Sequence, residues 1–513
     1  MTNRNSEDSA PIPAIVPWAL IGLGLLFRVV QYAHYRTLWS DEAWYAASMV
    51  EMSPLALFGP LQYGGCVAPP GYLIGSKWLI GLLGMNEYIV RLPSLVGGLL
   101  VLFLFYPVAK KLLSPRGAVL ALAFVAFCPH LIYYSTEVRQ YSTDAAAVVV
   151  LLWLALHFES QPLSWGEAAV FALAAAIIPW FSMTSVFVLA AIVVTHVLRS
   201  DLPNKARWLA AHTVWMASFA ALYVVSIAPI SRSANMANML SVYTDAGAFL
   251  PLLPRSASDV KWLRDAFLQV FDNPAGFSLP AAAGLAGFAF LLGCVSLFLR
   301  RKPRFLLVIL PFVFVLAASA LHRYPFYKRT ILFLVPLIFL VLGEGVAYLA
   351  VDSRKRWPIG AILLFALLIV QPAYRAARVV AQPTTHHELN RLLDYAQTNW
   401  RPGDLLCVPH LESLSFRFCN WRYGFKEEEY TVMAPPPTDK ELRKALWTQE
   451  LGALRDHARV WIPMVYDDPG VAKPLLDVVD ASGRRLDEFH AMGASIYLTD
   501  LSQTSASKQT PAP

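Results

Sequence analysis

The stretch from Gly117 to Phe158 reads GAVLALAFVAFCPHLIYYSTEVRQYSTDAAAVVVLLWLALHF, with one short polar segment between two apolar runs. An apolar run of about 20 residues can cross a bilayer as a helix, because lipid offers the backbone no other hydrogen-bond partner. The alternation recurs along the chain and predicts about eleven spans. They lie near residues 13–33, 88–109, 117–134, 143–158, 166–181, 183–199, 208–230, 278–299, 304–321, 330–350 and 358–381. Residues 179–182, between the fifth and sixth runs, form either a tight turn or a kink in one broken span.

The composition agrees with a membrane protein. Of 513 residues, 57% are hydrophobic and 15% are charged, whereas soluble domains carry about 25% charge. The 42 Lys and Arg exceed the 35 Asp and Glu. They sit in short clusters between apolar runs, so we expect no nucleic-acid partner. Five cysteines without a Cys/His cluster exclude a disulfide scaffold and a zinc site.

The basic clusters predict the orientation in the membrane, because cytoplasmic loops are enriched in Lys and Arg. They fall on alternate loops, at 110–116, 199–207, 300–304 and 354–356. The N-terminus is then cytoplasmic, and an odd number of spans puts the C-terminus on the other side. We therefore expect a multi-pass protein of a bacterial inner membrane, surrounded by membrane lipids, with its C-terminal domain in the periplasm.

The domain prediction has three parts. Residues 1–382 form the transmembrane domain, and its first outer loop, 34–87, carries amphipathic surface helices at 40–53 and 71–83. Residues 383–500 form a soluble α/β domain, with strands at Leu405–Val408, Val460–Val465 and Ala494–Leu498. Sequences typical of capping boxes begin at Thr385 and Thr438. Residues 501–513 are predicted to be a disordered tail.

The first candidate for a catalytic or binding motif is Trp39-Ser40-Asp41-Glu42-Ala43-Trp44-Tyr45, directly after the first span. One interpretation is structural: Ser40 caps a helix whose first-turn acids complement the helix dipole. The other is a general base, or a metal or sugar ligand, at the membrane surface. Carboxylates near lipid are costly unless they are paired or used.

A second motif, Tyr133-Tyr134-Ser135-Thr136-Glu137-Val138-Arg139-Gln140-Tyr141-Ser142, joins two spans on the same predicted outer side. Glu137 and Tyr141 are four residues apart and share a face if the segment is helical, with Arg139 pointing elsewhere. The structural alternative is an interfacial aromatic belt with one ion pair. The density of hydrogen-bonding groups favours a functional segment.

A third motif is His322-Arg323-Tyr324-Pro325-Phe326-Tyr327-Lys328-Arg329. This loop is predicted to lie outside, whereas Lys and Arg are usually enriched in cytoplasmic loops. Snorkelling side chains are therefore the weaker explanation, and an anion-binding site is favoured. Lys77, beside Trp78, could also reach a phosphate or merely snorkel.

Five residues in the tail are ambiguous. His386-His387-Glu388 resembles a metal-binding triplet but is better explained as part of a capping box. Cys407 and Cys419 could form a disulfide or occupy apolar positions, and their spacing does not decide between the two.

Taken in order, these motifs resemble those of GT-C membrane glycosyltransferases, in the protein mannosyltransferase and aminoarabinose transferase branch. The matching pieces cover about residues 13–350. They are Asp41–Tyr45, Pro69–Tyr72, Glu87–Ser94, Tyr134–Ser142 and Arg323–Phe326. One departure is that Val67-Ala68 precede the Pro-Pro pair where many relatives have a His, so a substrate contact by that His does not carry over.

The resemblance implies a GT-C fold, a polyprenyl-phosphate-linked sugar donor and transfer on the outer face. It also implies a catalytic acid at Asp41, followed by Glu42. Asp41 would accept the proton of an acceptor hydroxyl and the reaction would invert the anomeric centre. Cations would stabilise the phosphate leaving group, from among Arg323, Lys328, Arg329, Arg139 and Lys77. Sugar or acceptor contacts would come from Tyr45, Glu137, Tyr141, Tyr324 and Tyr327.

Several alternatives stay open at this stage. A divalent cation, Mg²⁺ or Mn²⁺, could bind at Asp41, since some GT-C enzymes use one, and we expect no nucleotide or organic cofactor. The acceptor could be a lipid, a glycan or a protein. A lipid-linked-sugar flippase would need ionisable residues in mid-span, which are scarce here. A glycan polymerase or ligase would use the same type of donor.

Overall fold

A computed structural model describes residues 12–63, 67–252, 255–349, 359–437, 439–465 and 469–502 of the chain. The described residues form two compact units. The membrane unit comprises Met1–His34, Glu51–Leu82 and Val90–Pro383, and the sheet unit comprises Tyr35–Val50, Leu83–Ile89 and Thr384–Pro513. Both ends of the 34–87 loop therefore group with the tail, whereas the predicted domain boundaries assign the loop as a whole to the membrane part.

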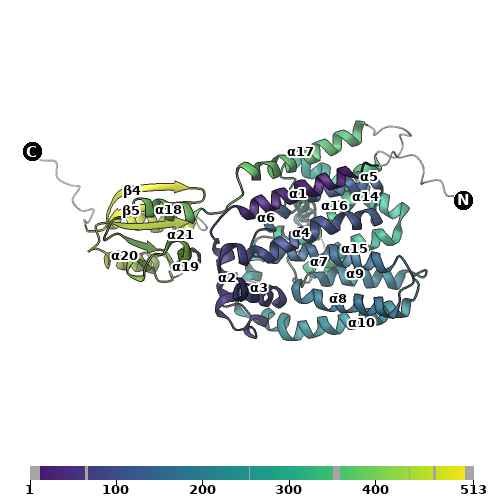
Figure 1. Cartoon of the computed structure of the whole chain (residues 1–513), viewed down its shortest axis with the longest axis horizontal. Helices are drawn as coiled ribbons and strands as arrows, with labels where there is room; N and C mark the ends of the chain where they lie inside the picture. The colour runs from purple at the N-terminus through teal and green to yellow at the C-terminus, as the bar shows by residue number, and fades with distance from the viewer. Residues whose placement is uncertain are drawn as a thin grey trace, which may run out of the picture. The chain divides into compact units, whose positions relative to one another are not determined.

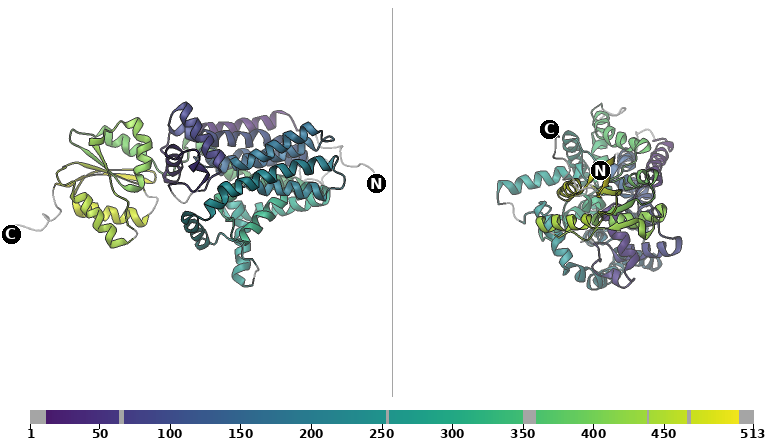
Figure 2. Two further views of the ribbon diagram at one scale, coloured as in Figure 1. Left: turned by 90° about the horizontal axis from the view of Figure 1, so that it is seen from below. Right: turned by 90° about the vertical axis from the view of Figure 1, so that its left-hand side faces the viewer.

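The membrane unit is a bundle of helices that run roughly parallel to one another (Figures 1 and 2). Among the described residues, eight helical segments are long and apolar enough to cross a bilayer. They are Ile15–Ala33 (α1), Glu87–Leu112 (α4), Tyr141–Phe158 (α7), Lys205–Ser231 (α10, Lys205–Leu222, to α11, Ala228–Ser231), Pro280–Arg300 (α14), Lys302–Ala320 (α15), Lys328–Tyr348 (ending in α16, Val335–Tyr348) and Ile359–Ala381 (α17). Three shorter apolar helices coincide with further predicted spans: Pro115–Phe127 (α5), Trp165–Phe181 (α8) and Ser185–Leu198 (α9). The predicted polytopic helical fold is confirmed.

Shorter helices complete the bundle. They are Pro70–Leu83 (α3), Pro129–Tyr134 (α6), Ala234–Asp245 (α12) and Ala257–Asp272 (α13). The predicted span 117–134 is broken into α5 and α6, which is a correction to the sequence analysis. Cys128 is extended (ψ 115°), because a residue before proline avoids the helical region. Between α8 and α9 the chain makes a tight turn, in which the backbone N–H of Ser185 donates to the carbonyl of Ser182 at 3.1 Å.

Helix α16 lies at the centre of the membrane unit, with 94% of its spanning segment buried. Glycines allow its neighbours to approach closely: a methyl group on Gly345 would meet the backbone of Ala289, and one on Gly293 would meet Val341. Small residues favour such packing between membrane helices. The one buried carboxylate of α16, Glu344, accepts from Ser114 N at 2.9 Å and from Ser296 Oγ at 3.1 Å.

The sheet unit contains a five-stranded sheet of order β2-β1-β3-β5-β4 with helices above and below it (Figure 2). Its strands are Leu405–Val408 (β1), Tyr430–Val432 (β2), Val460–Val465 (β3), Arg484–Ala491 (β4) and Ala494–Asp500 (β5). The first three are mutually parallel, whereas β5 is antiparallel to β3 and to β4. Its helices are Ser40–Glu51 (α2), Leu389–Thr398 (α18), His410–Tyr423 (α19), Lys440–Gly452 (α20) and Pro469–Ser482 (α21).

Alternate strand residues build the two cores of this domain. Leu406 and Trp461 pack with α18 and α19 on one face, and Cys407 and Ile462 pack with α20 and α21 on the other. This alternation is the two-residue repeat of a strand. The predicted α/β domain and its three predicted strands are confirmed.

Two strands were not predicted, and the start of one helix was predicted wrongly. Strand β2 has only three residues, and β4 is an edge strand with mostly exposed side chains, so neither carries an apolar run. Helix α18 begins at Leu389 without a side-chain cap, so the expected capping box at Thr385 is wrong. Glu388 Oε2 instead accepts from the backbone N–H of Met492 at 3.2 Å. Thr438 lies outside the described residues, and Asp439 caps α20.

Candidate functional site

The polar segment 135–142 is a buried turn between α6 and α7 in the membrane unit. Ser135, Thr136 and Glu137 have no exposed surface and Arg139 is 4% exposed. Local bonds fix the turn, since Ser135 Oγ donates to the carbonyl of Ile132 at 2.6 Å and Thr136 Oγ1 donates to that of Tyr133 at 2.9 Å. Such side-chain bonds replace helical ones at turns. The segment is therefore a buried and locally hydrogen-bonded part of the fold.

Helix α4 packs directly against this turn through two glycines. A methyl group on Gly98 would collide with the side chain of Ser135, and one on Gly97 would lie 2.9 Å from the backbone of Ser142. The Ser94 hydroxyl, one helical turn earlier, donates to the carbonyl of Arg139 at 2.9 Å. The turn is thus held from its own helices and from α4.

The structure brings the second and third predicted motifs together. The guanidinium of Arg329 lies over the ring of Tyr141, 5.9 Å from its centroid. Arg139 and Glu137 lie close enough to act electrostatically on the same tyrosine, and the ring of Tyr134 is 5.2 Å from that of Tyr141. Residues from two loops about 190 positions apart in the sequence therefore form one group. We call it the tyrosine–arginine cluster, and it comprises Tyr134, Glu137, Arg139, Tyr141, Tyr243, Tyr324 and Arg329.

Tyr324 forms the inner part of this cluster. Its hydroxyl donates to the carbonyl of Thr330 at 2.6 Å. Burial raises the pKa of Tyr324 well above its usual value, and nearby Asp144 adds to the effect, so the hydroxyl remains a neutral donor. Tyr327 lies beside Tyr243, with ring centroids 6.5 Å apart.

Two residues of this region were missed by the sequence analysis. Tyr243 comes from α12, a segment without a recognised motif. Asp144 is 4% exposed in the first turn of α7, near the hydroxyls of Ser182 and Thr184. A lone carboxylate at the start of an apolar run was a signal that could have revealed Asp144. No sequence signal distinguished Tyr243.

The remaining predicted cations are less buried. Arg323 and Lys328 are exposed, and the ammonium of Lys328 lies 4.8 Å from the centre of the Tyr327 ring. Lys77 is half-buried on α3. Of the predicted phosphate ligands, Arg139 and Arg329 are therefore the two that the structure groups with Tyr141.

In the sheet unit, the predicted helix after the first span is α2, and Asp41 lies in its first turn. Asp41 is half-buried, whereas Glu42 and Tyr45 have no exposed surface. Glu42 Oε1 lies 4.0 Å from Nη2 of Arg36, which is also buried. The two adjacent carboxylates thus occupy different environments, since Glu42 is fully buried and Asp41 is only partly buried, although its Oδ2 is covered.

A second group of side chains in the sheet unit surrounds Glu87. Its Oε1 accepts from the hydroxyl of Tyr35 at 2.9 Å, and its Oε2 accepts from Nε1 of Trp421 at 3.3 Å. Arg422 lies over the Tyr35 ring at 4.3 Å. Burial and the neighbouring Glu87 raise the pKa of Tyr35, so its hydroxyl remains a donor. These contacts group the ends of the 34–87 loop with α19.

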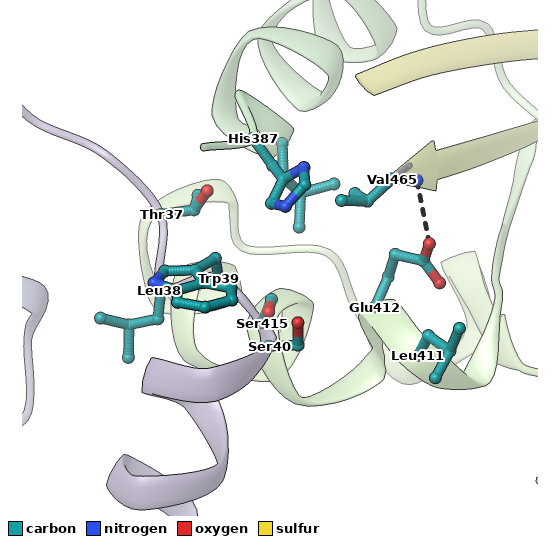
Figure 3. A pocket seen from close by; sticks show the side chains of 10 residues that line it. Thr37, Leu38, Trp39, Ser40, His387, Leu411, Glu412, Ser415 and Val465 are labelled. Carbon is teal, nitrogen blue, oxygen red and sulfur yellow. Dashed lines mark hydrogen bonds between the residues drawn. The ribbon is translucent and has the colours of Figure 1, made fainter. Parts of the chain in front are cut away.

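The four residues that precede Asp41 in the sequence line a pocket of the sheet unit (Figure 3). It is lined by Thr37, Leu38, Trp39, Ser40, His387, Leu389, Leu411, Glu412, Ser415 and Val465. Buried Glu412 accepts from the backbone N–H of Val465 at 2.9 Å, at the carboxyl end of β3. Ligands of parallel sheets commonly bind at this edge, where β2 and β3 flank β1 on opposite sides. The cavity volume is about 10 Å³, which holds about one water, so the pocket does not admit a sugar ring as it stands.

The described residues contain no group of three or more His, Cys, Asp or Glu arranged to hold a metal ion. A cation at Asp41 stays a prediction. His386 and His387 have structural partners, since the His386 ring lies 4.7 Å from that of Trp39 and His387 Nδ1 lies 3.1 Å from the carbonyl of Gly493. Cys407 and Cys419 are both free and buried on opposite faces of the sheet.

Comparisons with known proteins agree with this architecture. Residues 68–229 match the family model of dolichyl-phosphate-mannose-protein mannosyltransferase. The chain resembles ArnT from Cupriavidus metallidurans in the apo state, with a TM-score of 0.54 and 11% identity over 95% of this chain and 99% of that chain. The same protein bound to undecaprenyl phosphate gives a TM-score of 0.52 and 12% identity over 94% and 98% of the two chains.

An oligosaccharyltransferase from Archaeoglobus fulgidus, in complex with Zn and sulfate, gives a TM-score of 0.54 and 11% identity. That likeness covers 94% of this chain and 72% of that chain. A comparison with curated proteins gives no match. At these identities the structural likeness shows the fold.

Proposed function

The chain has the fold of the GT-C superfamily, and from this premise we propose that it is a membrane glycosyltransferase. It would move a sugar from a polyprenyl-phosphate-linked donor to a hydroxyl acceptor. The likeness to a protein solved with undecaprenyl phosphate supports this class of donor. We propose that the chain acts at the periplasmic face of a bacterial inner membrane, with a cytoplasmic N-terminus and a periplasmic C-terminal domain.

The observation that carries this proposal is the tyrosine–arginine cluster. A phosphate leaving group develops negative charge as its bond to the sugar breaks, and fixed cations stabilise that charge. Arg329 lies over Tyr141 and Arg139 is nearly buried beside it, so both guanidinium groups are held in place by the fold. One guanidinium group can bind a phosphate through two parallel N–H···O hydrogen bonds. We assign the donor phosphate to Arg329 and Arg139.

We assign the general base to Asp41. Its carboxylate would accept the proton of the acceptor hydroxyl while that oxygen forms a bond to the anomeric carbon. The bond from that carbon to the phosphate oxygen would break, and the electron pair would leave with the lipid phosphate. A single displacement of this kind inverts the anomeric centre. Half-buried Asp41 suits this role better than Glu42, which is fully buried near Arg36.

Other predicted site residues receive supporting roles in the proposal. Glu42 and Tyr45 would hold α2 in position from beneath, because both are fully buried. Tyr324 and Tyr327 would contact the sugar or the acceptor, whereas Glu137, which has no exposed surface, would hold the tyrosine–arginine cluster in position. The exposed cations, Arg323 and Lys328, and half-buried Lys77 would attract the anionic donor before it is bound. A divalent cation at Asp41 would supply charge stabilisation if one binds.

The test is a transfer assay with the full chain reconstituted in lipid. Radiolabelled polyprenyl-phosphate sugars and a crude envelope acceptor are supplied to wild type and to Asp41→Asn. We expect label to move to the acceptor only with wild type, with at least about a thousandfold loss in the variant, within the range that a positioned base contributes. The matched control is Asp265→Asn, which removes a surface carboxylate with a half-exposed side chain, and it should keep full activity.

Each contrary result has a defined meaning. Turnover retained by Asp41→Asn would remove the base assignment. Movement of the donor across vesicles, without transfer to any acceptor, would replace the transferase proposal by a flippase. Growth of the label into a polymer would indicate a polymerase or ligase with the same donor.

A further inference from the structure

A second cavity lies in the membrane unit, at the end of the bundle opposite the tyrosine–arginine cluster. Its lining comes from the last turns of α4, α7 and α9 and the first turn of α15. The cluster lies at the other end of α7, about 27 Å away by helix rise. The cavity volume is about 680 Å³, within the range of about 300–1,000 Å³ typical of ligand sites. We call it the basic cavity.

The basic cavity has a strong excess of positive charge. Five cationic side chains line it, Lys110, Lys111, Arg199, Arg301 and Arg304, together with one carboxylate, Glu159. The lining therefore carries a formal charge of 5 − 1 = +4. Like charges gathered in one concavity repel one another, and the repulsion is relieved when an anion binds.

The one carboxylate is already engaged. Glu159 Oε2 forms a 2.7 Å ion pair with Nη1 of Arg199, and its Oε1 accepts from Nε2 of buried His196 at 2.7 Å. His196 Nδ1 lies 3.1 Å from Nε2 of His212, whose Nδ1 accepts from Trp215 Nε1 at 3.0 Å. Because the indole can only donate, this chain of bonds assigns each neutral histidine a proton on Nε2. Both oxygens of the Glu159 carboxylate are thus already paired, one with His196 and the other with Arg199.

Two of the cations have a structural explanation. The ammonium of Lys111 donates to the carbonyl of Leu156 at 2.8 Å and to Ser160 Oγ at 3.1 Å, at the end of α7. Arg301 donates to the carbonyls of Leu112 at 3.2 Å and Leu113 at 3.4 Å, at the end of α4. Cations at helix C-termini satisfy the last carbonyl groups in this way.

Arg304 has no such explanation. Its side chain is half-buried and lines the cavity. In the part of the chain that the structure describes, its guanidinium makes no hydrogen bond and no ion pair. The charged groups that act on it are Arg301, Glu159 and Arg199. The two arginines repel it, and Glu159, which attracts it, is already paired with Arg199. A partly buried charge is costly without an opposite charge, and Arg304 therefore indicates an anionic ligand.

We propose that the basic cavity binds the phosphate of an anionic phospholipid headgroup, with Arg304 as its principal ligand. Basic pockets between membrane helices bind such headgroups. The lining also includes Leu156 and Leu307. Leu198, in the last turn of α9, and Leu299, in the last turn of α14, are 63% and 65% exposed, so these two helix ends also present apolar surface. An acyl chain needs this surface, whereas a soluble phosphate does not. This end of the bundle carries residues of the basic clusters 110–116, 199–207 and 300–304 and is cytoplasmic in the proposed topology.

The test is native mass spectrometry of the delipidated full chain in detergent, with added phosphatidylglycerol or with phosphatidylcholine of the same acyl chains. We expect wild type to retain phosphatidylglycerol in preference to phosphatidylcholine. Arg304→Gln should bind phosphatidylglycerol about tenfold more weakly, the effect of losing one charge-assisted hydrogen bond. Arg300→Gln is the matched control, because Arg300 is exposed over Tyr348 and does not line the cavity.

A further variant, Arg304→Lys, keeps the charge and should bind within about threefold of wild type, which separates loss of charge from loss of fold. Three results would overturn the proposal: equal binding of phosphatidylglycerol by Arg304→Gln and wild type, equal retention of the two lipids by wild type, or displacement of the lipid by millimolar inorganic phosphate. The last would assign the cavity to a soluble phosphate. The readout is a mass, so it does not depend on transferase activity.

Discussion

The hydroxyl of Ser94 donates a 2.9 Å hydrogen bond to the backbone carbonyl of Arg139. Ser94 has no exposed surface, and the hydroxyl of Tyr72, from α3, lies 3.4 Å from it. Tyr72 of α3 therefore contacts the hydroxyl of α4 that bonds to the arginine proposed to bind the donor phosphate. In the sequence these residues belong to three separate motifs.

Removal of this bond by Ser94→Ala should disturb the position of Arg139. We expect kcat/KM for the lipid-linked donor to fall about tenfold or less, because a net hydrogen bond contributes about 0.5–1.5 kcal/mol. The measurement is the transfer assay with varied donor concentration. Ser76→Ala is the control, since Ser76 is 1% exposed and its hydroxyl donates to the carbonyl of Tyr72 within its own helix, at 2.8 Å. Equal loss in both variants would show that the effect is not specific to Arg139.

Loss of the Arg329 charge by Arg329→Gln should weaken use of the donor more severely. The guanidinium over Tyr141 is proposed to stabilise the leaving phosphate. We expect kcat to fall about a hundredfold, which is the loss typical of enzymes that lack one hydrogen-bond donor to the transition state. Single-turnover transfer measures this step directly. Arg264→Gln, a surface arginine paired with Asp265 at 2.7 Å, should behave as wild type. A variant in which only KM for the acceptor rises would contradict the assignment.

Close packing of α4 predicts a strong effect of a single methyl group. In Gly98→Ala the new methyl would collide with Ser135, so either α4 or the turn 135–142 must move. We expect the variant to lose about 1–3 kcal/mol of stability, the cost of overpacking, and most of its transfer activity. Thermal unfolding in detergent and the transfer assay report the two effects. Gly22→Ala in α1, where the methyl meets no atom within 4 Å, should change neither.

Sequence patterns predicted the membrane helices and three strands well, because both are encoded by local apolar periodicity. The break at Cys128 was missed, since the apolar run continues through Pro129 and only the proline marks it. The edge strand β4 was missed because its residues are mostly polar.

For the site, the motifs carrying Arg139 and Arg329 were recognised from their density of polar groups. Their direct association was not derivable, since it depends on how α7 and the segment before α16 pack. Isolated polar residues inside apolar helices, such as His196 and His212, gave too weak a pattern. These two histidines contact each other from different helices, and only tertiary structure identifies that pairing.

The two tail cysteines should behave as unreactive thiols. Burial raises the pKa of Cys407 to about 12 and also raises that of Cys419, and the thiolate is the form that reacts. We expect their peptides to remain unlabelled by maleimide in the folded chain near pH 7 and to label fully after denaturation without reductant. Peptide mass spectrometry makes the measurement. Recovery of a peptide pair joining Cys407 to Cys419 would contradict the free thiols.

The carboxylate of Glu159 predicts a particular dependence of stability on pH. Burial opposes its ionisation, but hydrogen bonds and charges from His196 and Arg199 hold its pKa below the usual 4.5. A lowered native pKa means that the folded chain binds this proton less tightly than the unfolded chain. The stabilisation is therefore present above pH 4.5 and disappears as the pH falls through the lower native pKa.

We expect Glu159→Gln to lower the melting temperature by a constant amount from about pH 8 to pH 5, and the difference from wild type to shrink below about pH 4.5. Thermal unfolding of both proteins across this range, in one detergent, measures it. Lys111 and Arg304 also act electrostatically on this group, and Asp201 pairs with its partner Arg199. Glu428→Gln, at an exposed residue of the sheet unit, serves as the reference for loss of a distant acid. A difference that instead grows as the pH falls from 5 to 3 would show that burial, and not the partners of Glu159, controls its protonation.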